Sequence, residues 1–160
     1  MRRKNLKLLA AAAVIGMQLL TACGGSPGTQ KAAEAVAALR KIHAATEVGV
    51  NYQQYGMLLI EAKAKVNDAN AVLPDGELKN RLNAAVDAYT DASQVWGMKI
   101  NGPPLSPDKE PGATLMRKYN LKTHTISAAA LTYIDPEEAM RAMWGAAMGH
   151  LLMAQKQLEG

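Results

Sequence analysis

An apolar stripe with helical spacing restricts what the first half of this chain can fold into. Between residues 48 and 73, apolar side chains recur at steps of three and four residues, which is the spacing of one face of an α-helix. The stripe consists of Val48, Tyr52, Tyr55, Leu59, Ala62, Val66, Ala69 and Leu73. No segment alternates apolar and polar residues over more than a few positions, as a half-buried strand would. The sequence therefore predicts an all-α fold.

The segment before this stripe also consists of helix-forming residues, but its apolar positions are out of phase. Val36, Leu39 and Ile42 form a short stripe that does not continue into the next one, and Gly49 lies near the change. We expect a break between residues 46 and 49, so that residues 30–45 form an N-terminal helical extension. The extension either packs across the bundle as a separate helix or projects as a stalk, and the sequence leaves both open.

Turn and loop signals separate the first long helix from a second one. Pro74-Asp75-Gly76 combines three strong turn formers, which predicts that the chain reverses direction there. A second helix is predicted over residues 77–99. Residues 101–112 contain four prolines and two glycines, and proline removes a backbone donor that a helix interior needs. This segment is therefore predicted to be a long surface loop.

Two more helices are predicted after the loop. A third helix fits the apolar positions between Leu115 and Tyr133, with Lys122 as the one polar break. A fourth is predicted to start at residues 135–138, where an N-cap aspartate, a proline and two acids follow one another, and to end near Leu158. Together these elements predict an antiparallel bundle of about four helices with an N-terminal helical extension.

The N-terminal segment is organised like a secretory signal. Four basic residues in the first seven positions precede an uninterrupted apolar run over residues 8–17. About 7–15 apolar residues are typical of a signal peptide, whereas about 20 are needed to span a bilayer. The run leads to Leu20-Thr21-Ala22-Cys23, and Cys23 is the only cysteine of the chain.

These four residues resemble the lipobox of bacterial lipoprotein precursors, in which an aliphatic residue and two small residues precede an acylated cysteine. The resemblance implies cleavage after Ala22 and a covalent lipid on Cys23 as the membrane anchor. It divides the chain into a signal peptide (1–22), a lipidated tether (23–30) and a helical bundle domain (31–160). The alternatives are a buried structural cysteine and a non-lipid cleavage after Ala22.

The same resemblance suggests a location. In bacteria with two membranes, an aspartate after the acylated cysteine typically retains a lipoprotein in the inner membrane. This chain has Gly24 at that position. The resemblance therefore favours the periplasmic face of the outer membrane, with the membrane reached through the lipid anchor.

The net positive charge of the chain comes from the predicted signal segment. Of 18 basic residues, four lie before Cys23, which leaves 14 basic and 14 acidic side chains in the rest of the chain. Binding to nucleic acid through phosphate neutralisation needs a basic face. A nearly neutral domain therefore argues against a nucleic-acid partner.

The last predicted helix is rich in methionine and also carries a histidine. Met148, His150 and Met153 are candidate ligands for Cu(I), which prefers soft thioether and imidazole groups. However, Met140, Met143 and Trp144 fall on a narrow arc with Ala147 and Leu151, which is the pattern of a core stripe with methionine as a gap filler. Core packing is the favoured interpretation, so no metal or other cofactor is predicted beyond the lipid on Cys23.

A second candidate site lies at the start of the first long helix. Tyr52, Gln53 and Tyr55 form an aromatic and amide-rich patch that suits a peptide or a glycan, although both tyrosines also belong to the core stripe. The chain lacks the Gly-x-Ser-x-Gly, phosphate-loop and His-Glu-x-x-His patterns. We therefore expect a non-enzymatic interaction or structural module of the cell envelope, with another envelope protein as its partner. The alternative is a small-ligand or Cu(I)-binding periplasmic lipoprotein.

Overall fold

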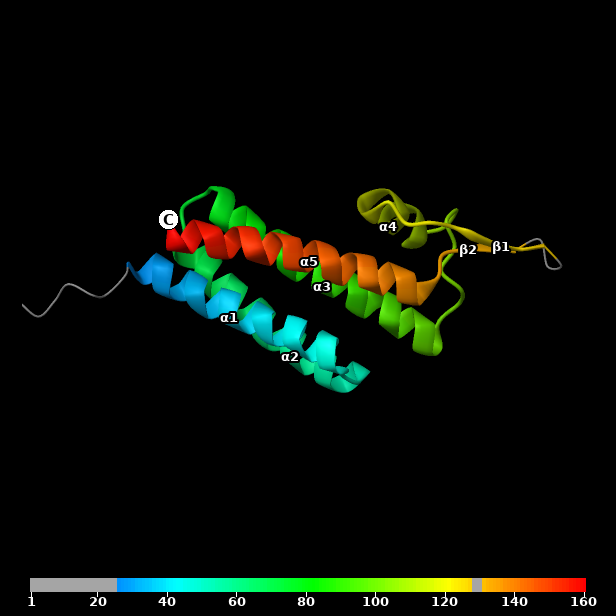
Figure 1. The fold of residues 1–160 in the computed structure, drawn as a ribbon, viewed down its shortest axis with the longest axis horizontal. Coiled ribbons are helices and arrows are strands. Elements are labelled where there is room, and N and C mark those ends of the chain that lie inside the picture. Colours follow the sequence, from blue (N-terminus) through cyan, green and yellow to red (C-terminus); the bar gives the residue numbers. More distant parts are fainter. Residues whose placement is uncertain (1–25, 128–130) are drawn as a thin grey trace, which may run out of the picture.

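The structure, a computed structural model, describes residues 26–127 and 131–160. Its four long helices are α1 (Pro27–Val48), α2 (Tyr52–Val72), α3 (Glu77–Asn101) and α5 (Pro136–Glu159). Helix α1 packs against α2 and α5, and α3 packs against α2 and α5, so that the four run up and down in alternation (Figure 1). The predicted all-α helical bundle is confirmed.

The predicted N-terminal extension is a full helix of the bundle rather than a stalk. Helix α1 begins at Pro27, where the Ser26 side chain accepts a hydrogen bond from the backbone N–H of Thr29 at 3.2 Å. Residues 27–30, which the sequence placed in the tether, therefore belong to the helix. Helix α1 ends at Val48, and Gly49 follows with φ 94°. This left-handed value favours glycine and ends the helix at the predicted break.

Local capping explains the starts of α2 and α5. Asn51 caps α2 in a capping box, in which its side chain accepts from the backbone N–H of Gln54 at 2.9 Å. Asp135 caps α5 by accepting from the backbone N–H of Glu138 at 2.9 Å, and Pro136 occupies the first turn. Helices α2 and α3 are separated by residues 73–76, as the turn signal predicted.

The predicted third helix is wrong over most of its length. The chain forms only the short helix α4 (Gly112–Tyr119), followed by an antiparallel hairpin of β1 (His124–Ile126) and β2 (Leu131–Tyr133). Asn120 ends α4 in the left-handed conformation, with φ 51°, which asparagine tolerates better than most residues. The two strands that follow, His-Thr-Ile and Leu-Thr-Tyr, each contain threonine next to isoleucine or tyrosine, residues that favour strands.

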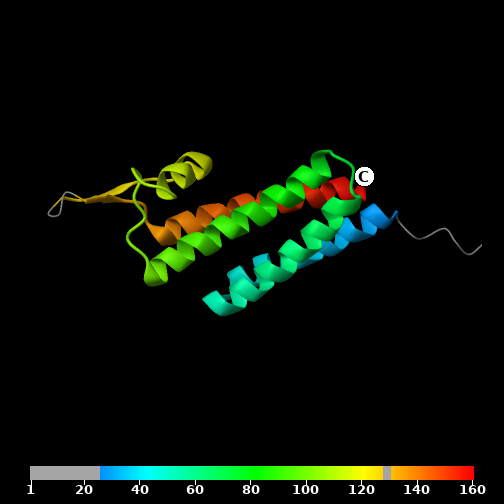
Figure 2. The ribbon, with the colours of Figure 1, turned by 180° about the vertical axis from the view of Figure 1, so that it is seen from behind.

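The core has two parts. The larger lies among α1, α2, α3 and α5 and includes the fully buried side chains of Leu39, Tyr55 and Tyr89. The smaller joins α3, α4 and α5 to the proline-rich loop through Leu105, Leu115, Ile134 and Met143 among others. The start of α1 and the end of α5 lie at one end of the bundle, and α4 with the hairpin lies at the other (Figure 2). None of the helices in the described residues combines the length and the apolar character needed to cross a membrane.

Candidate functional site

Four aromatic side chains form a cluster where the start of α2 packs against α3 and α5. They are Tyr52 and Tyr55 of α2, Trp96 of α3 and Trp144 of α5. The ring centroid of Trp96 lies 5.8 Å from that of Tyr52, 5.5 Å from that of Tyr55 and 6.0 Å from that of Trp144. These separations and the tilted ring planes are those of favourable aromatic pairs. The cluster joins three helices through one continuous set of rings.

Tyr55 is the buried end of this cluster and is fixed by hydrogen bonds. Its hydroxyl donates to the backbone carbonyl of Tyr89 at 2.8 Å and accepts from the indole N–H of Trp144 at 3.2 Å. Its side chain is fully buried, and burial raises the pKa of the Tyr55 hydroxyl well above its usual range. The phenol therefore stays neutral and joins α2 to α3 and α5; it does not reach a ligand at the surface.

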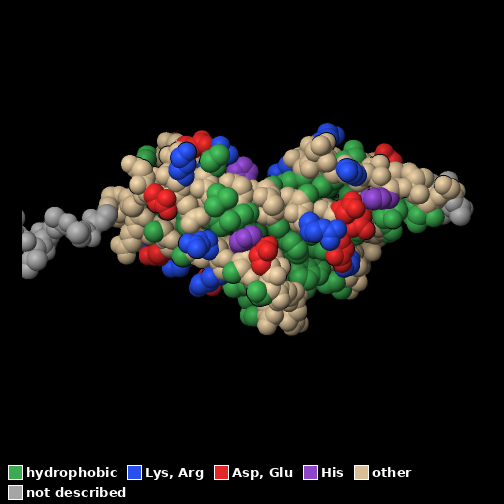
Figure 3. Space-filling model, in the orientation of Figure 1, with side chains coloured by type: hydrophobic (Ala, Val, Ile, Leu, Met, Phe, Trp, Pro, Cys, Tyr) green, Lys and Arg blue, Asp and Glu red, His purple; other side chains and the backbone are tan. Residues whose placement is uncertain are grey.

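Tyr52 and Gln53 are the accessible part of the predicted patch. Tyr52 is 37% exposed and Gln53 lies on the surface. A side-chain carbon at Gly97 would lie 2.9 Å from the Tyr52 hydroxyl oxygen, so the glycine lets the tyrosine pack closely on α3. Hydrophobic side chains gather on the face where these elements meet (Figure 3). The surface patch is thus Tyr52 and the half-buried Trp96, with Ile100, 51% exposed, one helical turn further along α3, whereas Gln53 lies about 100° further round α2.

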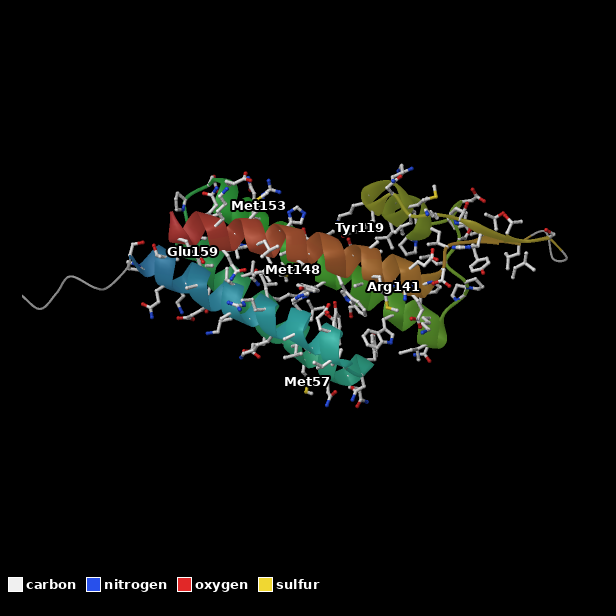
Figure 4. The ribbon with its side chains drawn as sticks, viewed as in Figure 1. Met57, Tyr119, Arg141, Met148, Met153 and Glu159 are labelled. Carbon is white, nitrogen blue, oxygen red and sulfur yellow. The ribbon has the colours of Figure 1, made fainter. Side chains whose placement is uncertain are left out.

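The structure does not bring the three candidate copper ligands together. Met148 is partly buried against the main core, whereas Met153 is 52% exposed on another side of α5 (Figure 4). The Nδ1 atom of His150 lies 3.1 Å from Nη1 of Arg81. Burial and then the positive charges of Arg81 and Lys118 lower the pKa of His150. The core interpretation of the α5 stripe is confirmed: Met140, Met143, Ala147 and Leu151 are buried, and Trp144 is partly buried against both parts of the core.

Other polar contacts join α4 to α3 and the hairpin to α5 at two separate places. The Tyr119 hydroxyl donates to Oδ2 of Asp91 at 2.6 Å, and Lys118 pairs with the same oxygen at 2.6 Å, which holds α4 on α3. At the base of the hairpin, Nε2 of His124 lies 3.0 Å from Oε2 of Glu138. Within residues 26–127 and 131–160, no three histidine, cysteine or carboxylate side chains form a group that would hold a metal ion.

Two shallow apolar hollows lie beside α1. One, of about 330 Å³, lies between α1 and α5 and is lined by Ala33, Val36, Ala37 and Leu158 with a polar rim. The other, of about 360 Å³, lies between the end of α1 and α2. It is lined by Ala45, Val48, Gly49, Val50, Gln54, Met57, Leu58 and Glu61.

The predicted lipid-attachment site lies outside the described residues. Leu20, Thr21, Ala22 and Cys23 all precede Ser26, where the described part of the chain begins. The lipobox therefore stays a prediction from the sequence. Comparison with family models, with curated proteins and with solved structures found no match to this chain.

Sequence reasoning missed the two tryptophans as members of the candidate site. Each tryptophan fits the apolar stripe of its own helix, and periodicity within one helix does not tell which residues of another helix it will meet. The spacing of Tyr52 and Tyr55 indicated an aromatic patch, but the partner rings of Trp96 and Trp144 come from α3 and α5. No signal in the sequence joins these helices.

Proposed function

We propose that this chain is a bacterial lipoprotein anchored through Cys23, with a non-enzymatic helical domain that serves as an interaction or structural module of the cell envelope. The observation that carries the proposal is Leu20-Thr21-Ala22-Cys23 at the end of a basic and then apolar N-terminal segment. The domain would lie on the periplasmic face of the outer membrane.

The architecture supports this proposal in two ways. Helix α1 begins four residues after Cys23, so the lipid anchor would hold one end of the bundle close to the bilayer. The Tyr52–Trp96 patch lies towards the other end, together with the exposed side chain of Ile100. Exposed apolar and aromatic side chains that lie together are typical of protein–protein contact sites.

The alternative function is the binding of a small ligand or of Cu(I) by a periplasmic lipoprotein. It requires Met148, His150 and Met153 to act together, whereas Met148 packs against the main core and Met153 is exposed on another side of α5 (Figure 4). Native mass spectrometry of the protein after loading with Cu(I) separates the two functions. A stoichiometric copper adduct that the Met148→Leu variant loses would favour the alternative.

A photo-crosslinking residue at position 100 tests the interaction function in intact cells. Ile100 is 51% exposed and lies one turn from Trp96. We expect a discrete adduct with another envelope protein, and no adduct from the same probe at Lys156, near the end of α5. If the probe at position 100 captures nothing more than the probe at position 156 does, the patch has no partner and the interaction function is wrong.

A further inference from the structure

The last turn of α3 ends in an asparagine that is followed by glycine. Asn101 is the final residue of the helix, and both Asn101 and Gly102 are exposed. The sequence contains this pair once, and every other asparagine is followed by a residue with a side chain. Glycine has no side-chain carbon to shield its backbone nitrogen. The nitrogen of Gly102 is therefore the one that a preceding asparagine side chain can approach with the least steric hindrance.

The packing of the chain over the end of α3 requires this glycine. A side-chain carbon at Gly102 would lie 2.9 Å from both the Cα atom and the backbone oxygen of Met98. The backbone of a helix cannot move aside as a flexible side chain can, so a larger residue would distort the last turn. The fold thus imposes an unshielded nitrogen directly after Asn101.

We propose that Asn101 is a site of spontaneous deamidation, with water as the co-reactant. The Gly102 nitrogen, after losing its proton to the solvent, bonds to Cγ of Asn101. The Cγ–Nδ2 bond breaks, and ammonia leaves with a proton taken from the solvent. Water then opens the resulting cyclic imide at one of its two carbonyl carbons. One opening gives aspartate, and the other gives isoaspartate, in which the main chain runs through the side-chain carbon.

The folded helix controls how often this reaction can start. The backbone N–H of Gly102 donates to the carbonyl of Met98 at 2.7 Å, so the nitrogen is engaged while the last turn is closed. The end of a helix frays more readily than its middle. Lys99 forms an ion pair with Glu137 at the start of α5 and holds this turn on the neighbouring helix. Opening of the turn is therefore the step that frees the nitrogen for attack.

Deamidation changes both the helix end and the surface beside it. The product carries a carboxylate at the negative end of the α3 dipole, where a negative charge is unfavourable. The new charge also lies next to Ile100, the exposed apolar residue beside the Tyr52–Trp96 patch. The modification therefore weakens the last turn of α3 and makes the rim of the patch acidic.

Mass spectrometry of the aged, full-length protein tests the site. Trypsin cleaves after Lys99 and Lys109, and in the peptide of residues 100–109 Asn101 is the one residue with a side-chain amide. After incubation in mildly alkaline buffer, this peptide should have the mass of the acid and elute as two products, aspartate and isoaspartate.

Asn120 is the matched control in the same sample. It is exposed at the end of α4, and the backbone N–H that follows it also donates to a helix carbonyl, that of Met116. Its successor is Leu121, whose side chain shields the nitrogen, so Asn120 should keep its amide while Asn101 loses its own. Loss of the Asn101 amide no faster than that of Asn120 would overturn the proposal.

Two comparisons test the control by the fold. Unfolding in urea removes the hydrogen bond to Met98 and should speed the loss of the Asn101 amide. Glu137→Gln removes the ion pair with Lys99, so it should speed the reaction in the folded protein and leave the rate in urea unchanged. Equal rates for the parent and Glu137→Gln in the folded state, or a rate in urea no higher than in the folded protein, would contradict this control.

The effect of the product on the helix end is measured with fixed variants. Asn101→Asp carries the charge of the product without the change in the main chain, and Asn101→Gln keeps a neutral amide that is one methylene longer. The midpoint of thermal unfolding should be lower for Asn101→Asp than for Asn101→Gln. A midpoint that is no lower would contradict the predicted weakening of the last turn.

Discussion

At the scale of single residues, the Tyr55 hydroxyl joins three helices. Tyr55→Phe removes the donor to the Tyr89 carbonyl and the acceptor for the Trp144 indole, and the indole N–H is left without that partner in a partly buried site. We expect the free energy of unfolding to fall by about 1–2 kcal/mol, as measured by urea denaturation. Tyr52→Phe is the matched control and should change it by less than about 0.5 kcal/mol, since Tyr52 is partly exposed.

Buried phenols also make stability depend on pH in the alkaline range. Burial and then the Asp91 carboxylate raise the pKa of Tyr119, and burial raises the pKa of Tyr89 to about 12. Unfolded tyrosine ionises near pH 10, so above this pH the unfolded state binds fewer protons and the free energy of unfolding falls. Urea denaturation should show constant stability up to about pH 9 and a decline towards about pH 11.

The contribution of Tyr119 to this decline can be isolated. The variant Tyr119→Phe lacks both the ionisable hydroxyl and its hydrogen bond to Asp91. Its stability should be lower than that of the parent at neutral pH but should decline less steeply above pH 10. An equally steep decline in parent and variant would show that Tyr119 does not titrate abnormally.

At the scale of the elements, the packing of α4 on the proline-rich loop depends on Gly112. A side-chain carbon at this position would lie 1.9 Å from the backbone oxygen of Ser106, so Gly112→Ala must move the loop or the helix. We expect a loss of at least about 2 kcal/mol in the free energy of unfolding. At Gly145, in the exposed face of α5, the same carbon meets nothing within 4 Å. Gly145→Ala should therefore stabilise the protein by about 0.5–1 kcal/mol.

Several helix ends and turns could be predicted from the sequence, whereas the hairpin and the aromatic cluster could not. The ends of α1 and α2, the turn after α2 and the start of α5 follow from Gly49, Pro74-Asp75-Gly76 and Asp135-Pro136, because each of these signals has a local physical cause. The hairpin could not be predicted, since strands of three residues are too short to show an alternating pattern and the apolar spacing there also fits a helix. The aromatic cluster could not be predicted either, because it depends on how α2, α3 and α5 are rotated against one another.

At the scale of the whole molecule, anchoring and folding should be separable. None of the helices described from residue 26 onwards includes Cys23. We therefore expect Cys23→Ala to abolish palmitate labelling and membrane retention while the helical circular dichroism and the midpoint of thermal unfolding stay unchanged. Palmitate incorporation that persists in Cys23→Ala would show that the lipid is attached elsewhere or not through a lipobox.

The up-and-down order of the helices sets the distance between the two ends of the bundle. The start of α1 and the end of α5 share one end of the bundle, and the 25 residues of α3 carry the chain to the other end, about 37 Å away at 1.5 Å per residue. If Cys23 carries the lipid, the bundle acts as a spacer of fixed height. Helix α4 lies part-way along this length, where it contacts Asp91 of α3, and with the bundle upright on the bilayer only the hairpin would hold a partner at roughly the full distance from the lipid headgroups (Figure 1).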